Sequence, residues 1–446
     1  MAPPTLTLAG GAPRPSGGDA GVGTGADAPA PSKDERLQRL VEQVRSGSAD
    51  AAGALADMGD DESRVAIARA GGIVPLVALL TAQDPAAGAE AARALRSLAY
   101  NNAENQVLIA QAGAIAPLVT LVQSGTDRQK EHAAGALRNL AVKNDENQVL
   151  IAQNGAIAPL VTLVKSGTDG QKEIAAGALR NIAFNADNKV LIAQNGAIAP
   201  LVTLVKSGTD GQKENAARAL KNLAAKNADN QVLIAQACAI APLLTLVQSG
   251  TDRQKESAAG ALFFLADIAE NKVLIAQAGA ITAPLVTLVQ SGTDGQKEHA
   301  AAALQSLAFN AENQVLIAQA GAIVALVTLV QSGTDRQKEH AAGALRSLAY
   351  NNAKNQVSIA QAGAIAPLVT LVKSGTDRQK EHAAGALRNI ALHAENQVSI
   401  AQAGAIAPLV TLVKSGTDGQ KEKAAGALRN IALHAENQVL IAQAGG

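Results

Sequence analysis

A string of about 42 residues repeats along most of this chain. The segment "SGTDRQKEHAAGALRNLA" begins at Ser124, and near copies begin at Ser166 and Ser374. The Asn of "NQV" or "NKV" marks the same period, because it recurs at steps of 41 or 42 residues from Asn105 to Asn437. A fixed period of this length predicts stacked copies of one small unit rather than a single globular core.

The period divides the chain into a tail and an array. Residues 1–33 are rich in Pro, Gly and Ala, so we expect a disordered tail there. Residues 34–446 form the predicted array, with nine full units over 63–436. A partial unit precedes them at 37–60, and another follows at 437–446. In that last copy, Leu440 and Ile441 lack the following segments that would cover them.

Each unit carries three helix signals. In the second full unit, the short first signal "NQVLIAQAG" ends at Gly113, and the second has Pro117 in its opening turn. The third begins at Thr126 with Gln129 three residues later, which is the pattern of a capping box. Its apolar stripe is too narrow for one unit to stand alone. The units therefore predict an all-α solenoid in which neighbours bury each other's apolar faces.

Composition excludes several kinds of partner. Lys+Arg and Asp+Glu are both 38, and this balance argues against a broad electrostatic surface for nucleic acid or anionic membranes. The chain has no Trp, four Phe and two Tyr, so a base-stacking platform is not expected. No apolar run reaches the roughly 20 residues of a membrane span, so we expect no direct membrane insertion. A cytoplasmic protein is the simplest interpretation, with a nuclear one as the alternative.

No residue pattern predicts catalysis, a metal or a cofactor. An enzyme needs a local group of nucleophile, base and orienting residue, whereas near-identical repeats offer the same surroundings many times. His132, His299, His340 and His382 begin third helices, and their pattern predicts solvated side chains without metal-ligand spacing. Cys238, the single cysteine, replaces a glycine that ends a first helix, so we expect backbone strain there.

The unit resembles the armadillo repeat of beta-catenin and importin-alpha proteins. The period, the proline in the second helix and the "AAGALRNLA" of the third carry this resemblance over residues 37–446. It implies a right-handed superhelix whose third helices line a concave groove. It also implies that the Asn of "LRNL" binds the backbone of an extended partner, with the preceding cation beside it. These positions are Asn139, Asn181, Asn222, Asn389 and Asn430, preceded by Arg138, Arg180, Lys221, Arg388 and Arg429.

Each of these positions also has an alternative interpretation. The Asn side chains would instead bond the backbone of a neighbouring unit, and the Arg side chains would be solvated surface charges. Gly135, in the middle of a third helix, either lowers the groove floor for a peptide or allows close packing between units. Phe263 and Phe264 replace the Arg-Asn pair in the fifth unit, where they are either a binding hot spot or a local packing variation.

The sequence therefore predicts a non-catalytic scaffold for protein–protein interaction. We expect it to bind an extended or helical segment of another protein, with acidic or mixed charge and an apolar anchor. One alternative is an importin-alpha-like transport adaptor, although no Trp is present where that class clamps lysine side chains. Another is the substrate-recognition component of a ubiquitin ligase complex. We expect a monomer, with a dimer through the uncapped C-terminus as the alternative.

Overall fold

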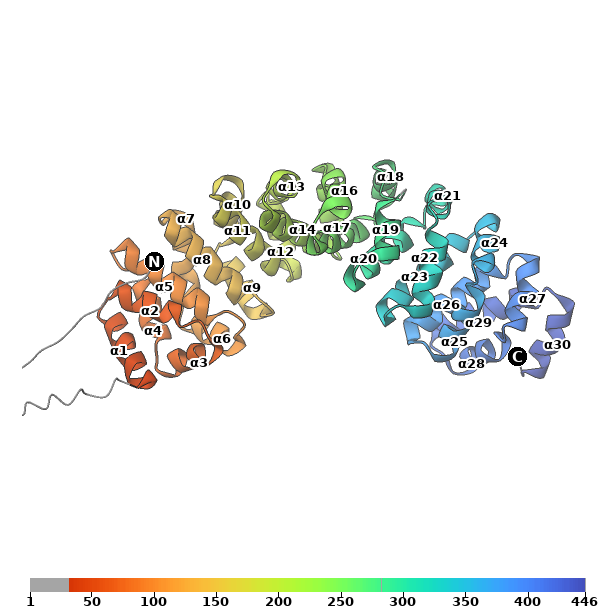
Figure 1. The fold of residues 1–446 in the computed structure, drawn as a ribbon, viewed down its shortest axis with the longest axis horizontal. Coiled ribbons are helices and arrows are strands. Elements are labelled where there is room, and N and C mark those ends of the chain that lie inside the picture. The colour runs from red at the N-terminus through yellow and green to blue at the C-terminus, as the bar shows by residue number, and fades with distance from the viewer. Residues whose placement is uncertain (1–31, 282, 446) are drawn as a thin grey trace, which may run out of the picture.

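The protein forms a long arch of stacked helices, with its two ends far apart (Figure 1). The structure is a computed structural model that describes residues 32–281 and 283–445. These residues form 30 α-helices and no β-strand. Most of the tail predicted for residues 1–33, and the inserted Thr282, lie outside the described residues. The first helix begins at Lys33 with Ser32 as its N-cap, at the end of the predicted tail.

Nine three-helix units are preceded by a helix pair and followed by one more first helix. The pair is α1 (Lys33–Arg45) and α2 (Ala49–Asp57). The first helices are α3 (Asp61–Arg69), α6 (Ala103–Gln111), α9 (Asp145–Gln153), α12 (Ala186–Gln194), α15 (Ala228–Gln236), α18 (Ala269–Gln277), α21 (Ala311–Gln319), α24 (Ala353–Gln361), α27 (Ala394–Gln402) and α30 (Ala435–Gln443). The second helices are α4 (Ile73–Leu79), α7 (Ile115–Ser124), α10 (Ile157–Ser166), α13 (Ile198–Ser207), α16 (Ile240–Ser249), α19 (Pro284–Ser291), α22 (Ala322–Ser332), α25 (Ile365–Ser374) and α28 (Ile406–Ser415). The third helices are α5 (Pro85–Leu98), α8 (Asp127–Leu140), α11 (Asp169–Ile182), α14 (Asp210–Ala224), α17 (Asp252–Leu265), α20 (Asp294–Leu307), α23 (Asp335–Ala349), α26 (Asp377–Ile390) and α29 (Asp418–Ile431).

Local chemistry sets the helix boundaries within each unit. Gly113 follows α6 with φ of 80°, a left-handed conformation that favours glycine. Cys238 takes φ of 60° at the equivalent place, which confirms the expected strained backbone. Thr126 caps α8, and its backbone N–H donates to Gln129 Oε1 at 2.9 Å in the predicted capping box. After the insertion at 282, α19 begins at its proline, whereas α7 begins two residues before its own.

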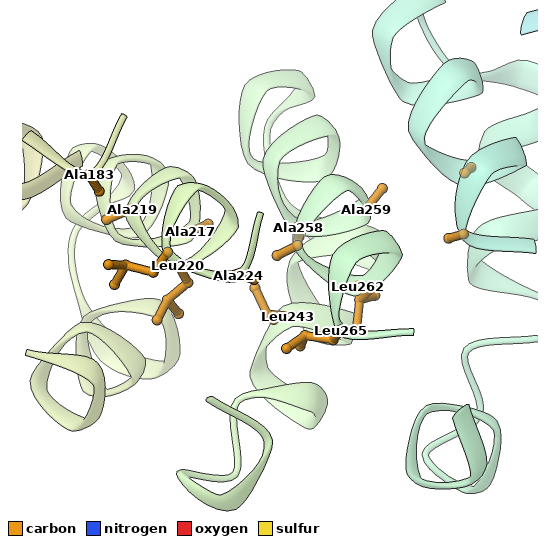
Figure 2. Packing of buried hydrophobic residues seen from close by; sticks show 14 of the residues in the cluster. Ala183, Ala217, Ala219, Leu220, Ala224, Leu243, Ala258, Ala259, Leu262 and Leu265 are labelled. Carbon is orange, nitrogen blue, oxygen red and sulfur yellow. The ribbon is translucent and has the colours of Figure 1, made fainter. Parts of the chain in front are cut away.

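The apolar core runs without a break from unit to unit. Ile109 of α6, Leu118 of α7 and Leu137 of α8 are all 0% exposed. Figure 2 shows the same arrangement further along, where leucine and alanine side chains of α14, α16 and α17 meet. At the C-terminal end, Leu440 is 45% exposed, the same as Leu274 inside the array. Ile441 is partly exposed, whereas the equivalent isoleucines, such as Ile109, are fully buried. Of the two residues expected to lack cover, only Ile441 is therefore more exposed than its counterparts.

Buried side-chain amides also join each unit to the one before it. In the first helices, Asn147 Nδ2 donates to the carbonyl oxygens of Leu140 at 3.0 Å and of Gln106 at 3.2 Å, both in the preceding unit. In the third helices, Gln212 Nε2 donates to the Asp169 carbonyl of the preceding unit at 3.0 Å. The same glutamine accepts from the Thr209 N–H at 3.1 Å, so it serves the helix cap and the unit junction together.

The angle between first and second helices bears on membrane insertion. Among the described residues, no single helix is long and apolar enough to cross a bilayer. Seven pairs of first and second helices reach that length and composition together, and each pair is bent by 82° to 85°.

Removing Gln212 is expected to destabilise the array more than removing Gln129. Gln212→Ala removes the acceptor of the Thr209 N–H in the cap of α14 and the side-chain donor to the Asp169 carbonyl, which together should cost about 2 kcal/mol. In the described structure Gln129 makes the capping box of α8 without the bond to the preceding unit. Gln129→Ala should therefore cost about 1 kcal/mol. Urea unfolding followed by circular dichroism would measure both, and equal losses would contradict a junction role for Gln212.

Candidate functional site on the third helices

The third helices form one continuous layer of the curved stack. Consecutive third helices, such as α11 and α14, pack against each other more extensively than consecutive second helices, such as α10 and α13. The closer-packed layer of a curved stack lies on its inside. Residues three, four and seven apart share one face of a helix, so equivalent positions of successive third helices form rows along this surface.

Three rows contain the predicted site, and each is named after its commonest residue. The arginine row is Arg96, Arg138, Arg180, Lys221, Phe263, Gln305, Arg346, Arg388 and Arg429. The asparagine row is Ser97, Asn139, Asn181, Asn222, Phe264, Ser306, Ser347, Asn389 and Asn430. The glycine row is Gly135, Gly177, Arg218, Gly260, Ala302, Gly343, Gly385 and Gly426.

The asparagine side chains link neighbouring units. Asn139 is 5% exposed, and its Nδ2 donates to the Arg96 carbonyl oxygen at 2.9 Å. Each other Asn of the row makes the equivalent bond to the preceding third helix: Asn181 to Arg138, Asn222 to Arg180, Asn389 to Arg346 and Asn430 to Arg388. These bonds match the alternative in which Asn bonds a neighbouring unit. Contact between these residues and a partner stays a prediction.

The arginine row lies over the glycine row of the next unit. A Cβ atom on Gly135 would lie 2.6 Å from Arg96 Cδ, which is too close for any side chain to fit without displacing the arginine. Gly177 stands under Arg138 and Gly385 under Arg346 in the same way. Glycine in mid-helix is thus explained by close packing, because it makes room for the stem of the preceding arginine.

Two positions of the glycine row, Arg218 and Ala302, do not hold glycine, and both agree with the pairing of arginine and glycine. Ala302 comes one unit after Phe263 rather than after an arginine, and Arg218 comes one unit after Arg180, whose Nη1 donates to Asn215 Oδ1 at 3.0 Å. The pattern within a single repeat does not predict this relation. It is visible as a correlation between positions 39 residues apart, such as Arg96 and Gly135.

Arg96, Arg138 and Arg180 of the arginine row are partly buried, whereas Arg388 further along the row pairs with Glu422 at 3.5 Å. Within the described chain, no carboxylate forms a salt bridge with Arg96, Arg138 or Arg180. Burial, followed by the nearby Arg96 charge, lowers the pKa of Arg138. Burial, followed by Arg218 and Arg138, lowers the pKa of Arg180 to about 10. A nearby carboxylate, Glu173 for Arg138 and Glu214 for Arg180, offsets part of each shift.

Phe263 and Phe264 form a small aromatic cluster at the middle of the array. Their ring centroids are 4.8 Å apart, and Phe263 meets the ring of His340 edge-on at 6.0 Å. Both rings are partly buried and pack against the core. Each ring is therefore partly accessible. This burial fits both interpretations of the pair, a binding hot spot and a local packing variation.

The histidines differ from their expected solvated state. His299 and His340 lie half-buried between third helices, where His299 Nε2 is 3.5 Å from Lys221 Nζ and His340 Nδ1 is 3.0 Å from Gln305 Oε1. His382 Nδ1 is 3.3 Å from Arg346 Nη1. Burial and the adjacent cation lower the pKa of His299 and of His382 to about 4. The sequence pattern missed their burial because it depends on side chains of neighbouring units.

Metal-ligating side chains are dispersed. In the part of the chain that the structure describes, no three His, Cys, Asp or Glu residues lie close enough together to hold a metal ion.

Comparison with known proteins identifies the repeat. The model of the armadillo/beta-catenin-like repeat matches residues 102–142, 144–184, 185–225, 310–350, 352–392 and 393–433, more than half of the chain. The chain belongs to the armadillo repeat family. The predicted family and the all-α armadillo solenoid are both confirmed. No curated protein matches the sequence.

Solved structures share the armadillo fold. One is an engineered protein with 31% sequence identity and a TM-score of 0.82, covering 89% of this chain and 99% of its own. Another comes from a study of the interaction between cadherin and beta-catenin. It has 17% identity and a TM-score of 0.76, and the match covers 93% of this chain and 87% of the other.

The packing of arginine on glycine predicts an energetic coupling between Arg96 and Gly135. Alanine in mid-helix is favoured over glycine by about 1 kcal/mol, but the new Cβ would displace Arg96. Gly135→Ala should therefore stabilise an Arg96→Ala protein by about 1 kcal/mol and give less or none of this gain in the wild type. A double-mutant cycle in urea would measure the difference, and simple additivity would exclude the coupling.

The buried histidines predict a loss of stability in mild acid. Because the pKa values of His299 and His382 fall to about 4 from an ordinary 6.5, the unfolded chain binds their protons first as the pH drops. The folded state should lose up to roughly 3 kcal/mol per histidine between pH 6.5 and 4. Melting temperatures across this range should fall less steeply for His382→Gln than for the wild type. Parallel curves would refute this contribution.

Proposed function

We propose that this protein is a non-catalytic scaffold that binds a segment of another protein along its third helices. Armadillo repeats and a fold shared with beta-catenin support a protein-interaction scaffold in general terms. The finer proposal concerns the ligand, which we infer to be an extended or helical segment of acidic or mixed charge with an apolar anchor.

The arginine row carries this proposal. Arg138 and Arg180 hold positive charge at half-buried positions, where burial and neighbouring cations lower their pKa and the nearby Glu173 and Glu214 offset this in part. Among the described residues, no carboxylate forms a salt bridge with either arginine. A carboxylate from a partner would relieve this repulsion and accept charge-assisted hydrogen bonds. A lysine-rich partner, in contrast, would add to the repulsion. The charge of the row therefore favours an acidic ligand over the basic one of an importin-type adaptor.

A second row of charge supports a ligand of mixed sign. Glu131 and Glu173 lie seven residues before Arg138 and Arg180 on the same helix faces. Their carboxylates sit beside Gly170 and Gly211 at the start of the next third helix. At other junctions an arginine occupies that place, as where Arg253 pairs with Glu214 at 3.8 Å. Where glycine takes the place of this arginine, as at Gly170 and Gly211, Glu131 and Glu173 are available to pair with basic side chains of the ligand.

Phe263 and Phe264 are the proposed apolar anchor site. Phe263 interrupts the arginine row and Phe264 the asparagine row at the fifth of nine units. A ligand lying along the arginine row would pass from Lys221 over the aromatic rings and the neutral Gln305 to Arg346. Central aromatic side chains of this kind often dominate binding energy.

Peptide binding tests the proposal through the arginine row. Isothermal titration of acidic, mixed and lysine-rich peptides should show binding by the first two. The double variant Arg138→Gln/Arg180→Gln should weaken it at least tenfold, because two desolvated charge pairs are lost. Arg253→Gln is the matched control, since this side chain is 79% exposed at a helix start. Binding by lysine-rich peptides alone would refute the ligand class.

Aromatic substitution tests the anchor separately. Phe264→Ala should lower the affinity of an anchored peptide about tenfold or more, as for a buried hot-spot residue. Phe184→Ala serves as the control, because this ring is 64% exposed in the turn that leads into a first helix. Unchanged affinity in Phe264→Ala would remove the anchor from the proposal and leave the charge rows standing.

A further inference from the structure

The exposed large apolar side chains gather on one edge of the array. Within the described residues, all but Val74 and Val324 lie on first helices or in the turns leading into them. Phe184 and Phe309, in two such turns, are each 64% exposed. Scattered apolar residues on a surface are ordinary, whereas an aligned set on one edge indicates an interaction surface.

Six consecutive first helices, α6 to α21, build this leucine edge. It is defined by their exposed leucines, which are 37% to 45% exposed: Leu108, Leu150, Leu191, Leu233, Leu274 and Leu316. The isoleucine that follows each leucine, such as Ile109, is 0% exposed and supplies the core contact. The leucine is not required for the helix, because Ser358 and Ser399 replace it in α24 and α27, which have the same length.

An acidic residue precedes each leucine of the edge by four positions. These residues are exposed in the first turns of the helices: Glu104, Glu146, Asp187, Asp229, Glu270 and Glu312. Positions four apart are neighbours on a helix surface, so each leucine has a carboxylate beside it. In α24 both change together, to Lys354 and Ser358. The edge therefore combines apolar and negative character over six units.

The spacing of the edge selects the shape of its occupant. Packed helices lie roughly 10 Å apart, and an α-helix rises 1.5 Å per residue, so one unit corresponds to about seven residues of a helix. A helical partner therefore presents the same face to every unit. An extended chain covers 10 Å in about three residues, and its alternating side chains would face opposite ways at successive units.

We propose that the leucine edge binds an amphipathic, basic α-helix of another protein. Such a helix carries an apolar residue once per heptad, which contacts the leucines, and Lys or Arg beside it, which pair with the acidic residues. Because the array is curved, a straight helix of about 20 to 25 residues would span three units. The edge lies on the first helices, so this proposal is independent of binding along the third helices.

The experiment measures binding of a synthetic probe helix by fluorescence anisotropy. The probe is a labelled peptide of about 24 residues with leucine once per heptad and flanking lysines. In Leu150→Ser/Leu191→Ser/Leu233→Ser the dissociation constant should rise at least tenfold. This variant should fold normally, because Ser358 and Ser399 occupy the same place in native helices. Circular dichroism checks that it does.

A charge variant gives a second test that keeps the leucines. Glu146→Lys/Asp187→Lys/Asp229→Lys should also weaken probe binding at least tenfold, and Lys354 shows that a first helix accommodates lysine there. The variant Arg138→Gln/Arg180→Gln should bind the probe as the wild type does, which separates this site from the proposed groove.

Several outcomes would overturn the proposal. One is unchanged probe affinity in the serine and lysine variants. Another is equal affinity for a probe with glutamates in place of its lysines. Leucine-dependent binding of anionic lipid vesicles without binding of the probe would assign the edge to a membrane. Loss of a dimer in the serine variant, seen by light scattering, would assign it to a second copy of this chain.

Discussion

Hydrogen bonds from buried side-chain amides to backbone carbonyls hold the register of the whole array. Hydrophobic contact between units is non-directional and would tolerate sliding, whereas a buried amide without its partner costs about 1 to 3 kcal/mol. Asn147 and Gln212 represent two series that make such bonds at nearly every junction, and the series of Asn139 adds another at five junctions. The rows along the third helices and the leucine edge keep their spacing because these bonds fix each unit on the one before.

Much of the fold could be predicted from the sequence because its determinants are local. Gly113 and Thr126 act within a few residues of themselves, so the helix boundaries they set are visible in one copy of the repeat. The period then implies stacking without any knowledge of contacts. Even Cys238, an isolated departure, had a predictable backbone conformation, since its position in the repeat demands positive φ.

The candidate site was less predictable because its side chains are defined by neighbouring units. Asn139 could serve a partner or another unit equally well on sequence grounds, and only its 2.9 Å bond to the Arg96 carbonyl places it at a junction. The contact of His299 with Lys221, two units earlier along the array, likewise cannot be deduced from one copy of the repeat. The arginine and glycine pairing was accessible, but only by comparing positions across repeats rather than along one helix.

The three amide series share one polarity, with donors always on the later unit and acceptor carbonyls on the earlier one. A chain made from its N-terminus therefore presents finished acceptor groups before their donors have been synthesised. Each emerging unit can dock on a surface that is already ordered, so folding can follow translation step by step. An array with the opposite bond direction would have to hold early donors unpaired until the next unit arrived.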